Sequence, residues 1–240
     1  MRARRIGATA GCCLFFFVAS AWAYRPYDST DADVADDDEV ELELGWRNSQ
    51  FETDEEQAAG AVFNLGIGHE REIVFEGEWR RSESPSAESD SSIGDVGLFL
   101  KQVHRRGSLQ GERGMSVASE YGVLIPTRSE DSGPGGECAL IASYSSSVLT
   151  FHTNASIAFE TDHRWSNSIG LIVEGPESWR IRPGLELLRE DSAGEEPELS
   201  MLVGAVWNSF EGLAFDLAYR RGLEPSKEPS EWRVGITWSR

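Results

Sequence analysis

The sequence is poor in cysteine, in long apolar runs and in positive charge, and each shortage excludes a class of protein. Only three cysteines occur in 240 residues, and two of them are Cys12 and Cys13, so a fold stapled by disulfides is excluded. Beyond roughly the first two dozen residues no run of about 20 apolar residues exists, which excludes a chain that crosses a membrane with helices. Acidic side chains number 41 against 22 basic ones, and the net charge of -19 argues against nucleic acid as a partner.

Residues 1–23 have the pattern of a signal peptide. A basic start precedes an apolar stretch from Ile6 to Val18, and Ala21-Trp22-Ala23 supplies small residues at the two positions that signal peptidase reads. We therefore expect export and a mature chain that begins at Tyr24. The alternative is a lipoprotein that begins at Cys12, but the apolar segment before this cysteine is too short.

The mature chain is expected to begin with a disordered acidic leader, residues 24–38. Asp28 to Glu39 contains seven acids and no base, with small residues between them, and such a composition buries too little apolar surface to fold. The one cysteine that remains after cleavage, Cys138, has no partner for an internal disulfide, and we expect it in a solvated loop.

From residue 39 to 240 apolar residues recur at every second position, which is the period of a β-strand and not of a helix. Twelve such segments follow one another, the first of them with Val40, Leu42, Leu44 and Trp46 on one face. Their connections nearly alternate between tight links and long acidic segments; the long ones are 48–58, 82–92, 127–137, 190–198 and 221–231. This rhythm predicts an all-β fold, an antiparallel up-and-down transmembrane β-barrel of twelve strands. A soluble sandwich or lipocalin-like barrel, with the apolar face turned inward, is the alternative.

Tryptophan placement favours the membrane barrel. An indole has an apolar body and one N–H donor, so it prefers the boundary between membrane and water. Seven tryptophans lie on the apolar parity of their segments, most of them near a segment end, and are predicted to form an aromatic girdle: Trp46, Trp79, Trp165, Trp179, Trp207, Trp232 and Trp238.

The opposite parity of the same segments is polar and is predicted to line the lumen. Charges enclosed there must pair or stay hydrated, so the interior is either a plug of ion pairs or a narrow polar path. The predicted lumen-lining residues are Glu41, Glu43, Arg47, Glu72, Glu76, Glu78, Arg80, Lys101, Glu120, His152, Asn154, Arg180, Arg182, Glu186, Asp216, Arg220 and Arg233.

No catalytic, cofactor or metal site is predicted. His152, Asn154 and Ser156 share one strand face and suggest a hydrolytic set, but side chains two residues apart on a strand stand about 6–7 Å apart. A nucleophile and its base must meet at hydrogen-bond distance, so a hydrated wall is the better interpretation. The four histidines show no metal-ligand spacing, and no glycine loop precedes a helix to hold phosphate.

Short motifs between Ile93 and Glu160 carry a family resemblance. They are Gly94, Asp95 and Lys101 at one strand opening, Pro126 and Thr127 followed by Gly133, Gly135 and Gly136, and then His152 and Asn154. These motifs resemble a family of Gram-negative outer-membrane barrels often called transporter-like proteins of the phenol meta-degradation pathway. The resemblance implies a barrel for hydrophobic or aromatic compounds and supplies no catalytic residues. Arg128 stands where the family has glycine, so the loop conformation there is expected to differ.

Three functions are consistent with these patterns. The first is a passive outer-membrane pore or transporter for small hydrophobic or aromatic compounds, with outer-membrane lipid as its surroundings and no nucleic acid partner. The second is a structural envelope barrel whose acidic loops bind divalent cations or partners, and the third is a soluble secreted β protein. The sequence identifies neither the solute nor the oligomeric state.

Overall fold

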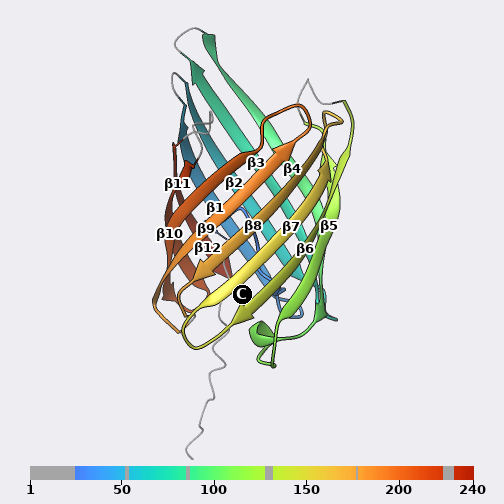
Figure 1. Cartoon of the computed structure of the whole chain (residues 1–240), viewed down its shortest axis with the longest axis vertical. Helices are drawn as coiled ribbons and strands as arrows, with labels where there is room; N and C mark the ends of the chain where they lie inside the picture. Colours follow the sequence, from blue (N-terminus) through green and yellow to red (C-terminus); the bar gives the residue numbers. More distant parts are fainter. Residues whose placement is uncertain (1–24, 52–53, 85–86, 128–131, 177, 224–229) are drawn as a thin grey trace, which may run out of the picture.

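Twelve antiparallel strands close into a single barrel in the part of the chain that the computed structural model describes (Figure 1). The described residues are 25–51, 54–84, 87–127, 132–176, 178–223 and 230–240, so the predicted signal peptide, 1–23, lies outside them. Each strand pairs with its neighbours in the sequence, and β1 pairs with β12 to close the barrel. The prediction of an all-β, antiparallel barrel of twelve strands is confirmed. Among the described residues, no helix is long and apolar enough to span a membrane.

The strands are 10 to 19 residues long. They are β1 Val40–Gln50, β2 Glu55–Gly66, β3 Arg71–Ser84, β4 Ala87–Arg105, β5 Ser116–Ile125, β6 Gly135–Ser145, β7 Thr150–Phe159, β8 Trp165–Glu174, β9 Ile181–Ser192, β10 Glu198–Phe210, β11 Leu213–Gly222 and β12 Ser230–Ser239. One 3-10 turn, η1 (Ser108–Gln110), lies in the link between β4 and β5.

The two ends of the barrel differ, as the alternation of connections predicts. We call the end that holds the connections after β2, β4, β6, β8 and β10 the turn end; β1 starts and β12 finishes there. The opposite end, which holds the other six connections, is the loop end. At the loop end β1 to β4 run through parts of 48–58 and 82–92 that the sequence predicts as loops, and Figure 1 shows β3 and β4 projecting beyond the rest of the barrel. These extensions are rich in Ser, Glu and Gln, so they lack the apolar alternation that marks the other strands, although their backbone ladder continues.

The barrel wall is apolar outside and polar inside. On β1 the side chains of Leu44 and Trp46 are 44% and 40% exposed. Glu43, which directly precedes Leu44, is only 1% exposed. The pleat places successive side chains on opposite faces, so the period of two in the sequence separates the two surfaces. The soluble alternative, with its apolar face inward, does not describe this barrel.

All seven tryptophans of the predicted girdle are exposed on the outside. The strand register places them in two groups. Trp46, Trp79, Trp165 and Trp232 lie toward the loop end, and Trp179, Trp207 and Trp238 lie at the turn end. Cys138 also differs from its prediction, because it lies exposed on β6 between Tyr121 of β5 and Ile157 of β7 rather than in a loop.

A small apolar core lies at the turn end beside η1. It joins Ala32, which precedes β1 in the sequence, to Leu109 of η1 and to inward side chains of β4, β5 and β6. Ala32 and Ile141 are both fully buried there. A barrel of about eight strands is just filled by its own side chains, so one of twelve has room for a further segment.

Candidate functional site

The segment before β1 lies inside the barrel. Residues 25–38, the described part of the predicted leader and from here on called the leader, run along the inner wall from β12 past β9, β7 and η1 toward the start of β1. Ser29, Asp31 and Ala32 are buried at 6%, 8% and 0% exposure. The prediction of a disordered segment therefore does not describe residues 25–38, and residue 24 lies outside the described part of the chain.

The inner wall holds the leader mainly by its backbone. The carboxylate of Glu186 accepts the N–H groups of Asp28 and Ser29 at 3.1 and 2.8 Å, and Glu72 accepts that of Ala35 at 2.8 Å. Asn154 accepts the N–H of Thr30 at 3.1 Å and donates to the carbonyl of the same residue at 2.6 Å. A segment that belongs to no helix or strand needs such acceptors, since buried backbone groups are costly when unpaired. The polar wall thus replaces the ladder that the leader lacks.

Glycines on the inner wall make the space in which the leader lies. A Cβ added at Gly184 would lie 1.7 Å from the Tyr27 hydroxyl, and one at Gly170 would lie 1.8 Å from Oγ of Ser29. A Cβ at Gly66 would meet the backbone carbonyl of Asp36 at 1.8 Å. These three positions therefore need glycine, because any side chain there would collide with the leader. Glycine within a strand often marks such a close approach of another backbone.

Replacing Gly184 is expected to displace the leader. Gly184→Leu forces Tyr27 off the wall, and such overpacking costs about 1–3 kcal/mol. The matched control is Gly60→Leu, because a Cβ at Gly60 meets its first neighbour only at 3.7 Å, beside the open part of the lumen. Limited proteolysis should cut the leader faster in Gly184→Leu than in Gly60→Leu, and equal rates would show that the glycine is not needed for seating.

Two ion-pair groups fix the ends of the buried part of the leader. Asp28 meets Arg220 and Arg233, each at 2.9 Å. Lys101, which is completely buried, has its Nζ 3.5 Å from Asp31 of the leader and 3.6 Å from Glu72 of β3. Burial alone raises the pKa of Asp28, but Arg233 and Arg220 outweigh it and hold that pKa well below its usual range. The leader is therefore attached by charge as well as by its backbone.

The pKa of Asp33 predicts a pH dependence of leader seating. Burial, with the nearby charge of Asp31, raises the pKa of Asp33 from 3.8 to about 7. The seated leader therefore favours the protonated acid, and its stability is greatest below pH 3.8 and falls as the pH rises toward about 7. We expect proteolysis of the leader to be faster at about pH 8 than at about pH 5, and Asp33→Asn to remove much of this difference. An unchanged pH profile in Asp33→Asn would contradict this role.

The structure places every predicted lumen residue on the inner wall except Arg180. Arg180 lies in the turn before β9, is exposed, and has its guanidinium 6.0 Å from the ring centroid of Trp207 on the outer surface. The turn breaks the alternation before the strand begins, and stacking on an indole stabilises a cation at a wet boundary. Arg180 is therefore a correction to the predicted lumen, whereas Arg182 two residues later does face inward and is 5% exposed.

The predicted lumen set omits several inner residues; most lie in a weak segment or in predicted connections, whereas Asn64 lies on the polar parity of a clear segment. Asn64, Ser143, Glu174 and Glu231 are among them, each 6% exposed or less. Ser143 and Glu174 both contact His152, whose Nδ1 lies 2.8 Å from the Ser143 hydroxyl and whose Nε2 lies 3.4 Å from Glu174.

This serine, histidine and glutamate arrangement is covered by the leader. The Ser143 hydroxyl accepts the backbone N–H of Ala32 at 2.9 Å and is 1% exposed. Ser156 pairs instead with Ser168 at 2.8 Å, so the set of His152, Asn154 and Ser156 considered from the sequence does not assemble. Ser143 and Asn154 bind the backbone of the leader, and His152 bonds to Ser143.

The half of the lumen nearer the loop end contains a cavity of about 910 Å³. Most of its lining is polar, and a few glycines and alanines, among them Gly45, Ala58, Gly60 and Gly94, leave space beside the charged side chains. The leader contributes Arg25, Tyr27 and Asp28 to its lining, so the leader bounds this cavity on the side toward the turn end.

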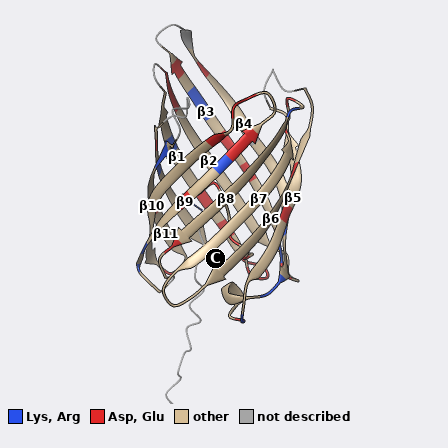
Figure 2. Cartoon of the chain, in the orientation of Figure 1, with Lys and Arg blue, Asp and Glu red and all other residues tan. Residues whose placement is uncertain are grey.

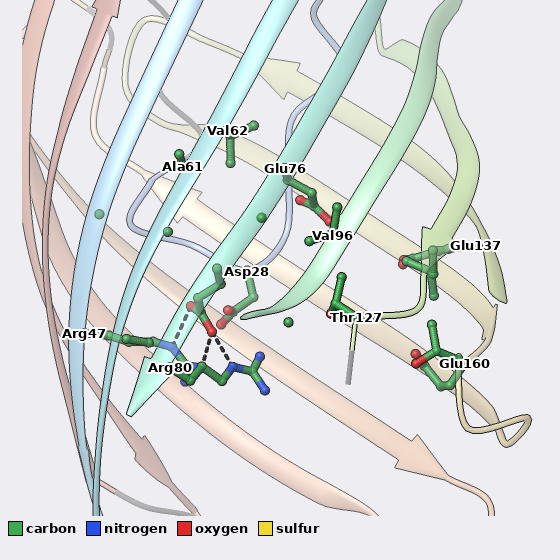
Figure 3. Close-up of a pocket in the computed structure, with 18 of the residues that line it drawn as sticks. Asp28, Arg47, Ala61, Val62, Glu76, Arg80, Val96, Thr127, Glu137 and Glu160 are labelled. Carbon is green, nitrogen blue, oxygen red and sulfur yellow. Dashed lines mark hydrogen bonds and ion pairs between the residues drawn. The ribbon is translucent and has the colours of Figure 1, made fainter. Parts of the chain in front are cut away.

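Charged side chains face each other across the cavity (Figure 3). On one side Arg47 donates to Glu78 at 2.8 and 3.0 Å and to Glu231 at 3.1 Å, and Arg80 also bonds to Glu78. On the other side Figure 3 shows Glu137 from β6 and Glu160 from the link that follows β7. Asp162 and Arg164 of the same link also line the cavity and form an ion pair. The arginines are thus engaged with carboxylates of their own wall, and acids outnumber bases on the inner wall and leader together.

Solved structures share this fold. The COG4313 outer membrane channel from Pseudomonas putida F1 superimposes with a TM-score of 0.67 at 11% identity, over 89% of this chain and 99% of that chain. The NanC porin gives 0.58 at 7% identity over 83% and 98%, and the KdgM porin 0.53 at 10% identity over 82% and 98%. No model of a known protein family matches the sequence, and comparison with curated proteins gives no match. At such identities the likeness is one of fold, and the fold is that of outer-membrane channels and porins.

Proposed function

We propose that this chain is a Gram-negative outer-membrane barrel that forms a pore for small solutes and is closed by its own leader. The observation that carries the proposal is a closed twelve-stranded barrel with an apolar outer surface, a charged interior and a cavity of about 910 Å³ beside the leader. An apolar exterior bounded by tryptophan at both ends suits a bilayer, and the closed sheet leaves no unpaired edge within it. The loop end then faces the outside and the turn end the periplasm.

The interior favours polar and positively charged solutes. Carboxylates outnumber cations on the inner wall, and an enclosed excess of one sign concentrates counter-ions. The hydrophobic or aromatic solutes and the link to phenol degradation come from the family resemblance alone, and this charged lining does not support them. No catalytic role is proposed, because the Ser143 hydroxyl beside His152 is occupied in binding the leader. Glu174 beside the same histidine is paired with Arg182.

The test is an ion-current measurement on refolded protein in planar bilayers. We expect infrequent current steps from the intact chain and a reversal potential that indicates cation selectivity, which weakens at high salt as the charges are screened. Heat-modifiable migration on gels checks insertion beforehand. Anion selectivity, or a solubility that needs no detergent, would reject the proposal.

A structural barrel without transport is the second candidate, and the buried leader favours it. A leader that never leaves the lumen would make the chain an envelope protein with a permanently filled interior. The two candidates separate in the same bilayer experiment, since a structural barrel passes no current at any voltage while it migrates as a folded, inserted protein.

A further inference from the structure

The outer surface carries a group of arginines at the turn end, on the side of β3 to β5. Arg71 is the first residue of β3, Arg105 the last of β4, and Arg106 and Arg113 lie in the link that follows. All four are exposed, and Figure 2 shows basic positions at this corner of the barrel. We call these four residues the turn-end arginine patch.

The patch begins where the apolar surface stops. Ile73, Leu100 and Tyr121 pair side by side across β3, β4 and β5 and form an apolar outer row. The next outward row toward the turn end is Arg71, Gln102 and Ser119, in the same register. On the other side of the barrel the corresponding boundary carries Trp179, Trp207 and Trp238.

Of the sixteen arginines that the structure describes, nine form ion pairs, and three of the other seven belong to the patch. Arg106 binds Glu70 and Glu112. Within the described residues the side chains of Arg71, Arg105 and Arg113 make no ion pair or hydrogen bond, although acids outnumber bases 41 to 22 in the chain. Arg189 and Arg221 are unpaired as well in the described part of the chain, but they lie toward the loop end. What distinguishes the patch is that its free guanidinium groups lie together at the edge of the apolar surface, where an anion from outside can bind them.

We propose that the turn-end arginine patch binds the phosphate of an anionic phospholipid, such as phosphatidylglycerol, in the leaflet at the turn end. This rests on the proposed membrane insertion, which puts the row Arg71, Gln102 and Ser119 at the level of the head groups. Guanidinium groups match phosphate in geometry, and Arg71 and Arg105 stand on adjacent strands roughly 10 Å apart along the wall, within joint reach of one head group. The adjacent row of Ile73, Leu100 and Tyr121 would hold the acyl chains.

The test compares lipid binding by three refolded proteins: the intact chain, Arg71→Gln with Arg105→Gln, and the control Arg189→Gln with Arg221→Gln. Arg189 and Arg221 are also exposed on the outer surface, but toward the loop end. Detergent-solubilised protein is titrated with phosphatidylglycerol or with phosphatidylcholine, and the lipid retained is measured by native mass spectrometry. Each neutralised arginine of the patch should weaken phosphatidylglycerol binding about fivefold.

The intact chain and the control variant should retain phosphatidylglycerol in preference to phosphatidylcholine, and the patch variant should lose the preference. Equal losses in both variants, or no preference in the intact chain, would overturn the proposal. So would binding of an acidic peptide or free phosphate that displaces the lipid. Heat-modifiable migration in phosphatidylcholine vesicles reports insertion separately, so a barrel that inserts without lipid preference refutes only this inference.

Discussion

Removal of residues 25–38 is expected to turn a closed barrel into a conducting one. The leader bounds the cavity on the side toward the turn end, and the wall behind it is lined by glycines and by side chains that bind it. Without the leader the cavity of about 910 Å³ extends toward the turn end. We expect current steps from the shortened protein at voltages at which the intact chain stays closed.

The control keeps the leader but removes charge from its exposed part. Asp36, Asp37 and Asp38 are exposed at the turn end, so their joint replacement by serine should leave the barrel closed. If the shortened protein conducts no better than the intact one while both migrate as folded barrels, the leader is not the closing element.

The second large effect is expected from Lys101→Met. Lys101 is buried between Asp31 and Glu72, and removing one partner of a buried ion pair costs about 3–5 kcal/mol because it leaves the other charges uncompensated. Much of this cost falls on the contact between leader and wall, since Thr30 Oγ also lies 3.3 Å from the lysine. The variant should show rapid proteolysis of the leader and frequent current steps.

A double substitution separates this effect from general loss of stability. Lys101→Met together with Glu72→Gln removes one carboxylate with the lysine and should restore much of the protection of the leader. In the chain that lacks residues 25–38, Lys101→Met should lower the free energy of unfolding less than in the intact chain. If Lys101→Met lowers the free energy of unfolding equally in the intact and the shortened chain, Lys101 stabilises the barrel wall and not the leader.

The fold was accessible from the sequence because one physical rule governs most of the wall. Where lipid-facing and interior residues alternate, as from Val40 to Trp46, the apolar parity marks both the strand and its outer face. The rule fails where strands extend past the apolar band, as at Ser82 on β3, and at strand starts, as at Arg180, which the turn directs outward.

The leader could not be predicted in the same way. Its carboxylates and small residues have the composition of a disordered segment, and nothing local orders them. Its partners lie far away in the sequence, such as Glu186 for Ser29 and Asn154 for Thr30. One signal was present: glycines at inward positions, such as Gly170 and Gly184, which indicate a close approach of another backbone.

Many residues of the candidate site could be predicted from the sequence, but their role could not. Inward positions such as Glu72, Lys101 and Glu186 follow from parity, but parity does not distinguish a water-filled lumen from one that binds a segment of its own chain. That distinction depends on whether the inward carboxylates accept hydrogen bonds from water or from backbone N–H groups of the leader. Here the Glu186 carboxylate takes two of them from the leader.

Disulfide formation between the leader and β8 tests the position of the leader most directly. In a chain that carries Cys138→Ser, Ser29→Cys and Gly170→Cys would place two thiols together, because a Cβ at Gly170 lies 3.0 Å from that of Ser29. Disulfides need this separation to be about 3.5–4.5 Å, which requires only a small shift of the leader. We predict spontaneous cross-linking in the folded barrel, detected by mass spectrometry, and no current steps until a reductant is added. Two free thiols in a folded, inserted barrel under oxidising conditions would contradict a leader seated inside it.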